Sequence, residues 1–255
     1  MNRLSRVILS VLMIKMLIVA AVLAQEAPIA LREDFNNLDN WKPLTFPKIE
    51  RHSEYVITLE NDGKRILTTR SKASASGIIY KGSFSAYHHP ILLWRWKVDN
   101  VYSKADPHTK QGDDYPLRVY VIFEYDPAKA GLAQRAMYGL AKKLYGEYPP
   151  LASLSYVWAS QNITEPFFDS PYTDRAKMIP LRSGTEKLGQ WVEEEVNILA
   201  DYRRVFGEDP PESASLAIMN DSDNTGEAAV SHMDFIEVRS SVSDSGNIGP
   251  KPVTP

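Results

Sequence analysis

The stretch richest in chemically capable side chains lies near the C-terminal end of the chain, from Leu216 to Val238. A short apolar run there leads into a polar loop, and an alternating segment follows. The loop contains Asp221, Asp223, Asn224 and Glu227, and Gly226 allows a tight turn. Calcium prefers about six to eight oxygen ligands, of which carboxylates and amide carbonyls are the usual protein donors. The sequence therefore predicts a structural calcium site with these four residues as ligands.

This loop cannot be an EF-hand, the usual self-contained calcium loop. Position twelve of that pattern requires a bidentate Glu, and the residue here is His232. A metal site would need ligands from elsewhere, such as Asp34 or Asp234, where the closing strand meets the acidic N-terminal segment. The alternative interpretation is an Asx-rich turn whose side chains satisfy their own backbone.

A second group of polar residues occupies alternating positions of predicted strands. If those strands are neighbours, their polar sides form one concave, charged surface. Arginine binds carboxylates with a two-pronged geometry, so such a surface suits a carbohydrate or an anionic envelope polymer. The alternative is a solvated face of cross-strand ion pairs. The predicted ligand-binding residues are Arg95, Lys97, Arg118, Tyr120 and Glu124, joined by Asp113 and Asp114 from the loop that enters the clearest strand.

Two catalytic arrangements on this surface remain open. A polysaccharide lyase could use Tyr120 as the acid, with Arg118 and Arg95 neutralising a uronate. A glycoside hydrolase could pair Glu124 with Glu193 or Glu195. The sequence contains none of the G-x-S-x-G, H-E-x-x-H, P-loop or G-x-G-x-x-G motifs that would indicate other common chemistries.

The elements that must position these residues are mostly strands. Alternating or apolar runs predict strands over 55–59, 65–69, 77–80, 91–98, 117–125, 151–159, 175–182 and 191–199. The run over 91–98 places Trp94 and Trp96 on one uniformly apolar face, which favours core packing over a sugar-stacking platform. A short helix is expected over 201–206, ending at Gly207. Ala133, Met137, Leu140 and Leu144 recur at helical spacing, which predicts an amphipathic helix over 127–146.

This pattern predicts an all-β, single-domain β-sandwich, jelly-roll-like, over residues 25–239, with one inserted amphipathic helix. The helix either packs on a sheet or presents a face to a protein partner, which would make the protein an envelope adaptor. Residues 240–255 are polar and rich in Pro and Gly, so we expect a disordered tail. The sequence leaves the oligomeric state open.

Composition and the N-terminus limit the compartment and the partners. The chain has 255 residues, a net charge of -3 and no cysteine, which gives no electrostatic case for nucleic-acid binding. Arg3 and Arg6 precede an apolar run over 7–23, which predicts a signal peptide over 1–24 and a periplasmic or secreted protein. An uncleaved anchor is the alternative. After signal removal no apolar run is long enough to span a membrane.

Six ordered blocks of sequence resemble a bacterial secreted family known as domain of unknown function three-thousand-forty-seven. They read LLWRWKVDNVY, GDDYPLRVYVIFEYD, SLSYVWAS, YTDRAKMIPLRSG, DYRRVFGEDPP and AIMNDSDNTGE. The resemblance covers Phe35 to Val238 and implies an envelope location and a sandwich fold, without a reaction or catalytic residues. The acidic opening and the closing DFIEV are also similar, more loosely, to the ends of jelly-roll carbohydrate-binding modules.

Overall fold

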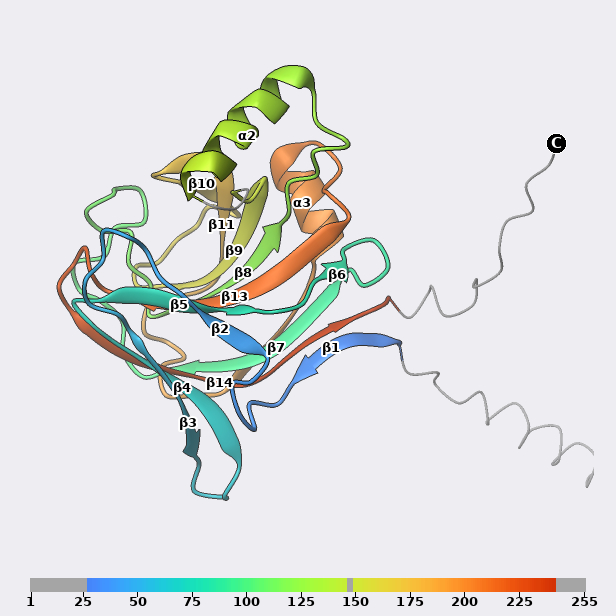
Figure 1. Ribbon diagram of the computed structural model, residues 1–255. Coiled ribbons are helices and arrows are strands. Elements are labelled where there is room, and N and C mark those ends of the chain that lie inside the picture. Colours follow the sequence, from blue (N-terminus) through green and yellow to red (C-terminus); the bar gives the residue numbers. More distant parts are fainter. Residues whose placement is uncertain (1–26, 146–148, 242–255) are drawn as a thin grey trace, which may run out of the picture.

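The computed structural model describes residues 27–145 and 149–241. The predicted signal peptide, residues 1–24, lies outside the described residues, as do residues 242–255 of the predicted tail. Two β-sheets face each other across a hydrophobic core, and helices α2 (Leu132–Tyr145) and α3 (Ile198–Phe206) lie together at one end of the layers (Figure 1). The predicted all-β sandwich is confirmed.

The first sheet has six strands around the long closing strand β14 (Ala228–Arg239). The path runs β12 (Val192–Asn197), β7 (Ile91–Val98), β14, β4 (Arg65–Lys72) and β3 (Glu54–Leu59), with β1 (Ile29–Glu33) paired to β14. Strand β14 pairs with β7 on one edge, and on the other it pairs first with β4 and then with β1. The closing strand therefore meets the acidic N-terminal segment, as the sequence predicts.

The second sheet has eight strands. Its path runs β10 (Phe168–Ser170), β11 (Thr173–Ser183), β9 (Ala152–Ala159), β8 (Leu117–Phe123), β13 (Ser213–Asp221), β5 (Ala75–Tyr80) and β2 (Trp41–Leu44), with β6 (Phe84–Ser85) paired to β13. The β9–β11 pair is parallel, whereas β8 and β13 are antiparallel. This antiparallel pair at the middle of the sheet positions the candidate site.

The core lies between the two sheets and follows the period of two along each strand. Leu92, Trp94, Trp96 and Val98 alternate with half-buried residues on β7 and are completely buried. Trp96 of the first sheet packs against Trp158 of the second, with ring centroids 5.8 Å apart. The interpretation of Trp94 and Trp96 as core residues is confirmed.

Helix α3 follows strand β12 directly and begins at Ile198, three residues before the predicted start at 201. The side chain of Asn197 accepts a hydrogen bond from the Ala200 amide at 2.9 Å, which caps the first turn. Gly207 ends the helix at φ 69°, a left-handed conformation that glycine adopts without strain. Because Asn197 both ends β12 and caps α3, the strand becomes a helix without a loop.

Helix α2 begins later than predicted and presents a different face to the protein. Met137 was expected on the buried face, but it is 62% exposed. Tyr138 is buried instead, and its ring stacks on that of Tyr125 with centroids 3.9 Å apart. This aromatic pair fixes the rotation of the helix about its axis. Neighbouring residues point about 100° apart around that axis, so burying Tyr138 turns Met137 away. Neither helix in the described part of the chain has the length and apolar character needed to cross a membrane.

Candidate functional site

The candidate site forms where two polar sequence blocks meet at the middle of the eight-stranded sheet. Asp113 and Asp114 lead into β8, while Asp221 ends β13 and Asp223 follows it. Because these strands are antiparallel, with Arg118 opposite Met219, the start of β8 lies beside the end of β13. Residues predicted as two separate sites, one for a ligand and one for calcium, therefore form one group. We call Asp113, Asp114, Asp221 and Asp223 the acidic cluster.

Backbone contacts hold the two blocks in place. The amide of Asp221 donates to the Tyr115 carbonyl at 3.2 Å, so the loop before β8 is tied to the end of β13. Gly112 in this loop has no room for a side chain, because a Cβ would lie 2.3 Å from the Asp106 amide nitrogen. Gly226 closes the second loop at φ 73°, and its amide donates to the Ser222 carbonyl at 2.9 Å. The positions of both loops are thus fixed by glycine geometry and backbone pairing.

Arg118 is the cation at the centre of the acidic cluster. It is 4% exposed and makes a direct ion pair with Asp221. Its Nη1 lies 3.7 Å from Oδ2 of Asp113, too far for a hydrogen bond. The rings of Tyr115 and Tyr120 lie 4.8 Å and 5.5 Å from the guanidinium carbon, within range of cation–π attraction. The positive charge of Arg118 is therefore already engaged within the protein.

Asp114 organises the loop that follows β13. Its carboxylate accepts hydrogen bonds from the Thr225 amide at 2.6 Å and from the Asn224 amide and side chain at 3.3 Å and 3.0 Å. Oxygen atoms of Asp114, Asp221 and Asp223 all lie within 4.8 Å of one another. Carboxylates this close repel one another unless a cation or a proton intervenes.

Burial dominates the electrostatics of this cluster. It raises the pKa of Asp113 and of Asp223, and it raises the pKa of Asp221 well above its usual range, although Arg118 opposes the change. The negative charge of Asp114 adds to all three increases. Burial likewise raises the pKa of Tyr120 to about 12. Burial therefore opposes negative charge on these carboxyl groups, and the tyrosine of the site is not activated as a base.

A pocket of about 540 Å³ opens beside this cluster on the outer face of the eight-stranded sheet. We call it the Tyr120 pocket. Its charged end contains Asp113, Arg118, Asp221 and Asp223, and its walls are largely aromatic or apolar. The wall residues include Phe46, Pro47, Ile49, Tyr120, Tyr172, Ala176, Met178 and Met219. Tyr172 is 56% exposed at the rim, and Nζ of Lys110 lies 5.3 Å from the centroid of its ring.

Arg95 and Lys97 do not contribute to this pocket, so the single charged surface predicted from the sequence does not form. Both lie on β7 in the six-stranded sheet. Arg118 and Tyr120 lie on β8 of the other sheet, and Glu124 comes directly after that strand. Arg95 pairs with Asp234 at 2.9 Å, and Lys97 pairs with Glu60 at 3.0 Å. The sequence shows that a residue faces outward on its strand, but not from which sheet.

The two catalytic arrangements suggested by the sequence are not assembled either. The lyase arrangement needs Arg95 beside Tyr120, and the sandwich places them in different sheets. Glu124 accepts a hydrogen bond from Ser213 at 2.7 Å, beyond the end of β8, while Glu193 and Glu195 lie on β12 of the six-stranded sheet. These carboxylates cannot flank one glycosidic bond.

The predicted calcium ligands divide between two places. Asp221 and Asp223 lie in the acidic cluster, and Asn224 donates to Asp114. Glu227 instead accepts from Ser103 and Lys104 of another loop, at 2.7 Å to 3.2 Å, and these bonds lower its pKa.

The distant ligands considered for calcium are also absent from the cluster. Asp34 pairs with Arg32 at 2.9 Å, and Asp234 pairs with Arg95. Three carboxylates are close enough for a metal ion, but Asp114 and Asp221 already accept hydrogen bonds on both oxygens. Calcium needs about six or more oxygens, and this cluster offers one ligand atom from each of three residues, so the calcium site stays a prediction.

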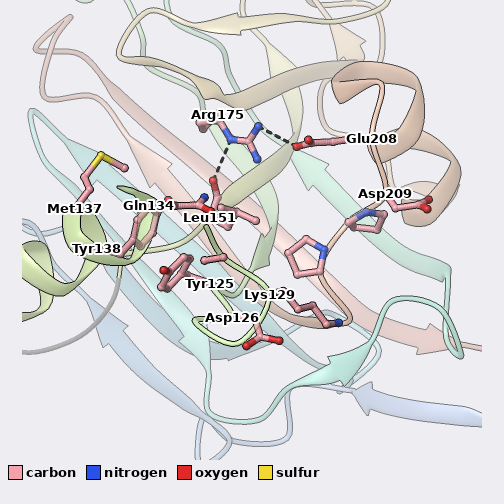
Figure 2. A pocket seen from close by; sticks show the side chains of 13 residues that line it. Tyr125, Asp126, Lys129, Gln134, Met137, Tyr138, Leu151, Arg175, Glu208 and Asp209 are labelled. Carbon is pink, nitrogen blue, oxygen red and sulfur yellow. Dashed lines mark hydrogen bonds and ion pairs between the residues drawn. The ribbon is translucent and has the colours of Figure 1, made fainter. Parts of the chain in front are cut away.

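A second hollow of about 460 Å³ lies between α2 and the loop after α3 (Figure 2). Arg175 crosses it and donates to the Leu151 carbonyl at 3.2 Å and to Glu208 at 3.0 Å. On α2 itself, Leu132 and Met137 are exposed, but five residues of helix turn them about 140° apart. Of the predicted apolar face, the side chains of Ala133, Leu140 and Leu144 lie outside the described ones, so the adaptor hypothesis stays a prediction.

Several wall residues of the Tyr120 pocket were not singled out from the sequence. Phe46 and Ile49 lie in the β2–β3 connection, and Tyr172 lies between β10 and β11. Met178 lies on β11 and Met219 on β13, and strands β9 and β8 separate them in the sheet order. The one wall residue that the sequence did single out is Tyr120, which occupies an outward position between apolar neighbours on β8.

Comparison with known proteins identifies the family. The profile described as "Protein of unknown function (DUF3047)" matches residues 39–237, and the chain belongs to this family. The predicted family resemblance is confirmed. No curated protein matches the chain.

Several solved structures are similar to the chain at low sequence identity. One is the family 11 carbohydrate-binding module of cellulase Lic26A-Cel5E from Clostridium thermocellum, with 11% identity and a TM-score of 0.41, covering 84% of this chain and 95% of that one. Another is the K3 adhesin domain of Lys-gingipain from Porphyromonas gingivalis, with 12% identity, a TM-score of 0.38 and coverage of 84% and 100%. A third is lectin I-B4 from Griffonia simplicifolia, with 9% identity, a TM-score of 0.38 and coverage of 83% and 100%.

Proposed function

We propose that this member of the DUF3047 family binds a carbohydrate in the Tyr120 pocket and does not transform it. The observation behind the proposal is the composition of the pocket. Aromatic and methionine side chains form its walls, and carboxylates lie at one end. Sugars present apolar C–H faces that pack on aromatic rings, and hydroxyl groups that donate to carboxylate oxygens.

The interior of the pocket argues for binding over catalysis. Tyr120, the phenol nearest Arg118, has a pKa raised to about 12, so it is a poor base at neutral pH. The charge of Arg118 is shared with Asp221 and with two tyrosine rings. Arg118 therefore has little remaining capacity to bind a uronate, and the anionic-polymer version of the original prediction loses its main residue. Calcium forms no part of the proposal, because Arg118 already pairs with Asp221, the most buried of the predicted calcium ligands.

The compartment we propose is the periplasm or the exterior of the cell. This rests on the charged and apolar N-terminal pattern over residues 1–24. Glycans of the cell envelope would then be the ligands within reach. Fractionation of cells that express the full chain tests this, with N-terminal sequencing of the mature protein.

The function is tested with a panel of neutral, acidic and amine-bearing oligosaccharides, with thermal shift and calorimetry as readouts. A ligand that binds only the native state raises the melting temperature. Tyr172→Ala removes the exposed ring at the pocket rim, and we expect it to weaken binding roughly tenfold, or about 1.4 kcal/mol. Tyr87→Ala is the matched control, because Tyr87 is a partly exposed tyrosine outside the pocket lining.

Two outcomes would reject the proposal. One is that no oligosaccharide in the panel shifts the melting temperature at millimolar concentration. The other is that a ligand binds, but Tyr172→Ala and Tyr87→Ala weaken it equally. Chromatography of the incubated glycans detects turnover, and released products would replace simple binding with catalysis.

A further inference from the structure

The Tyr120 pocket has more negative than positive charge at its polar end. The acidic cluster supplies four carboxylates, three of which line the pocket, and Arg118 is the guanidinium among them. Lys48 also lines the pocket, but it is exposed and lies in the β2–β3 connection. Burial and mutual repulsion raise the pKa of Asp113 and Asp223, as expected where negative charge is undercompensated.

Asp113 has an ion-pair partner in Arg118, but one of its carboxylate oxygens has no hydrogen-bond donor. It is 5% exposed and lines the pocket, and its Oδ1 makes no hydrogen bond with any described residue. Its Oδ2 faces Arg118 at 3.7 Å, beyond hydrogen-bonding distance. A buried carboxylate oxygen without a donor costs free energy, which a donor on a ligand would recover.

The chemistry of the missing donor can be narrowed. An anionic group would meet three lining carboxylates, so it is excluded by repulsion. A divalent metal needs about six oxygens, whereas the three carboxylates that lie close together offer one ligand atom each. A primary ammonium group has three donors and needs no such shell, so Asp113, Asp223 and one further acceptor satisfy it.

Building on the proposed glycan function, we propose that the natural ligand carries a protonated primary amine and is an oligosaccharide containing de-N-acetylated amino sugars. The ammonium group faces Asp113 and Asp223, while the sugar ring packs against Tyr120 and Tyr172.

The test compares two probes of equal length by calorimetry at physiological salt: a glucosamine tetrasaccharide and its fully N-acetylated counterpart. We expect the amine form to bind at least about tenfold more tightly, because a charge-assisted hydrogen bond is gained. Asp223→Asn should remove this preference and change the affinity for the N-acetylated form less than about twofold. Asp223 is only half-buried, so the variant is expected to fold.

Asp113→Asn is a second variant with the same expected effect, and Glu193→Gln is the matched control. Glu193 is an exposed acid on the six-stranded sheet, so it reports general attraction between the acidic protein and a cation. Equal loss of preference in Glu193→Gln and Asp223→Asn would overturn the assignment to this pocket.

The remaining outcomes separate this inference from the proposed function. Equal affinity for the two probes, or preference for the N-acetylated one, overturns the amine requirement but leaves glycan binding intact. Failure of every glycan in the panel overturns both. Calcium chloride alone is titrated in parallel, and saturable binding that Asp223→Asn abolishes would identify the cation as a metal and overturn the ammonium assignment.

Discussion

Two outward faces of the sandwich contain similar residues but differ in electrostatic character. On the six-stranded sheet, Arg95 and Lys97 flank the ring of Trp191, at 5.2 Å and 4.7 Å. Glu60 accepts from both Lys97 and Trp191 at 3.0 Å to 3.2 Å. We call this group the Trp191 face. Each of its charges has an opposite charge or a ring beside it.

On the eight-stranded sheet, the Tyr120 pocket contains one deeply buried cation and an excess of carboxylates. The side chains of Arg95 and Arg118 are 39% and 5% exposed, respectively. The comparison teaches that charge on a strand does not make a site by itself. Burial makes the imbalance costly, and a ligand can then relieve that cost.

The sharpest way to break the comparison is to remove the arginine from each region. Arg118→Met leaves Asp221 buried without its cation, and we expect a loss of about 3–5 kcal/mol in the free energy of unfolding. Arg95→Met at the half-exposed position should cost no more than about 1 kcal/mol. Urea denaturation measures both. Adding Asp221→Asn to Arg118→Met should restore part of the loss, and similar costs for the two single variants would contradict the distinction.

The aromatic rings of the two regions give the next largest contrast. Trp191→Ala removes two cation–π contacts, and we expect about 1–2 kcal/mol of lost stability without a change in glycan affinity. Tyr172→Ala should do the reverse, weakening binding while unfolding at nearly the same denaturant concentration. Weakened glycan binding by Trp191→Ala would place a sugar platform on the Trp191 face instead.

The pH dependence of stability should also differ between the wild type and an Asp113 variant. Burial raises the pKa of Asp113 in the folded state, so the folded protein retains this proton to higher pH than the unfolded chain does. The destabilising effect of the buried Asp113 carboxylate is absent below the pKa of Asp113 in the unfolded chain, at about pH 4. The effect grows as the pH rises through the pKa of Asp113 in the folded protein.

Asp113→Asn removes that effect. The melting temperature of the variant minus that of the wild type should therefore become more positive between about pH 4 and pH 7. Thermal unfolding followed by circular dichroism across this range measures the difference. A change in the opposite direction would mean that Arg118 stabilises the Asp113 anion more than burial destabilises it.

The smallest expected effect is that of a chelator. Because Arg118 pairs with Asp221 and Asp114 is saturated by the following loop, we expect EDTA to leave the melting temperature unchanged to within about one degree. Asp223→Ala is the matched variant. A drop on chelation in the wild type, absent in this variant, would restore the predicted calcium site and require Arg118 to move.

Local pattern alone determined most of the longer strands and which side of them faces the core. The alternation in ILLWRWKV identifies β7 and its buried tryptophans, and Asn197 with Gly207 sets the limits of α3. Strands β2, β6 and β10 were not predicted, because two to four residues are too few for a period of two to be recognised. On α2, the Tyr125–Tyr138 stack outweighed the helical period in choosing the buried face.

Only the tertiary structure decided which outward side chains share a surface. The alternation along each strand indicates that Arg95 and Arg118 both point away from the core. The strand order, however, assigns them to different sheets. The antiparallel pairing of β8 with β13 then joins Asp113 and Asp114 to Asp221 and Asp223, which lie far away along the chain. Long-range pairing depends on the whole core, so the sequence determined the ligand chemistry of each block while the fold combined the blocks into one site.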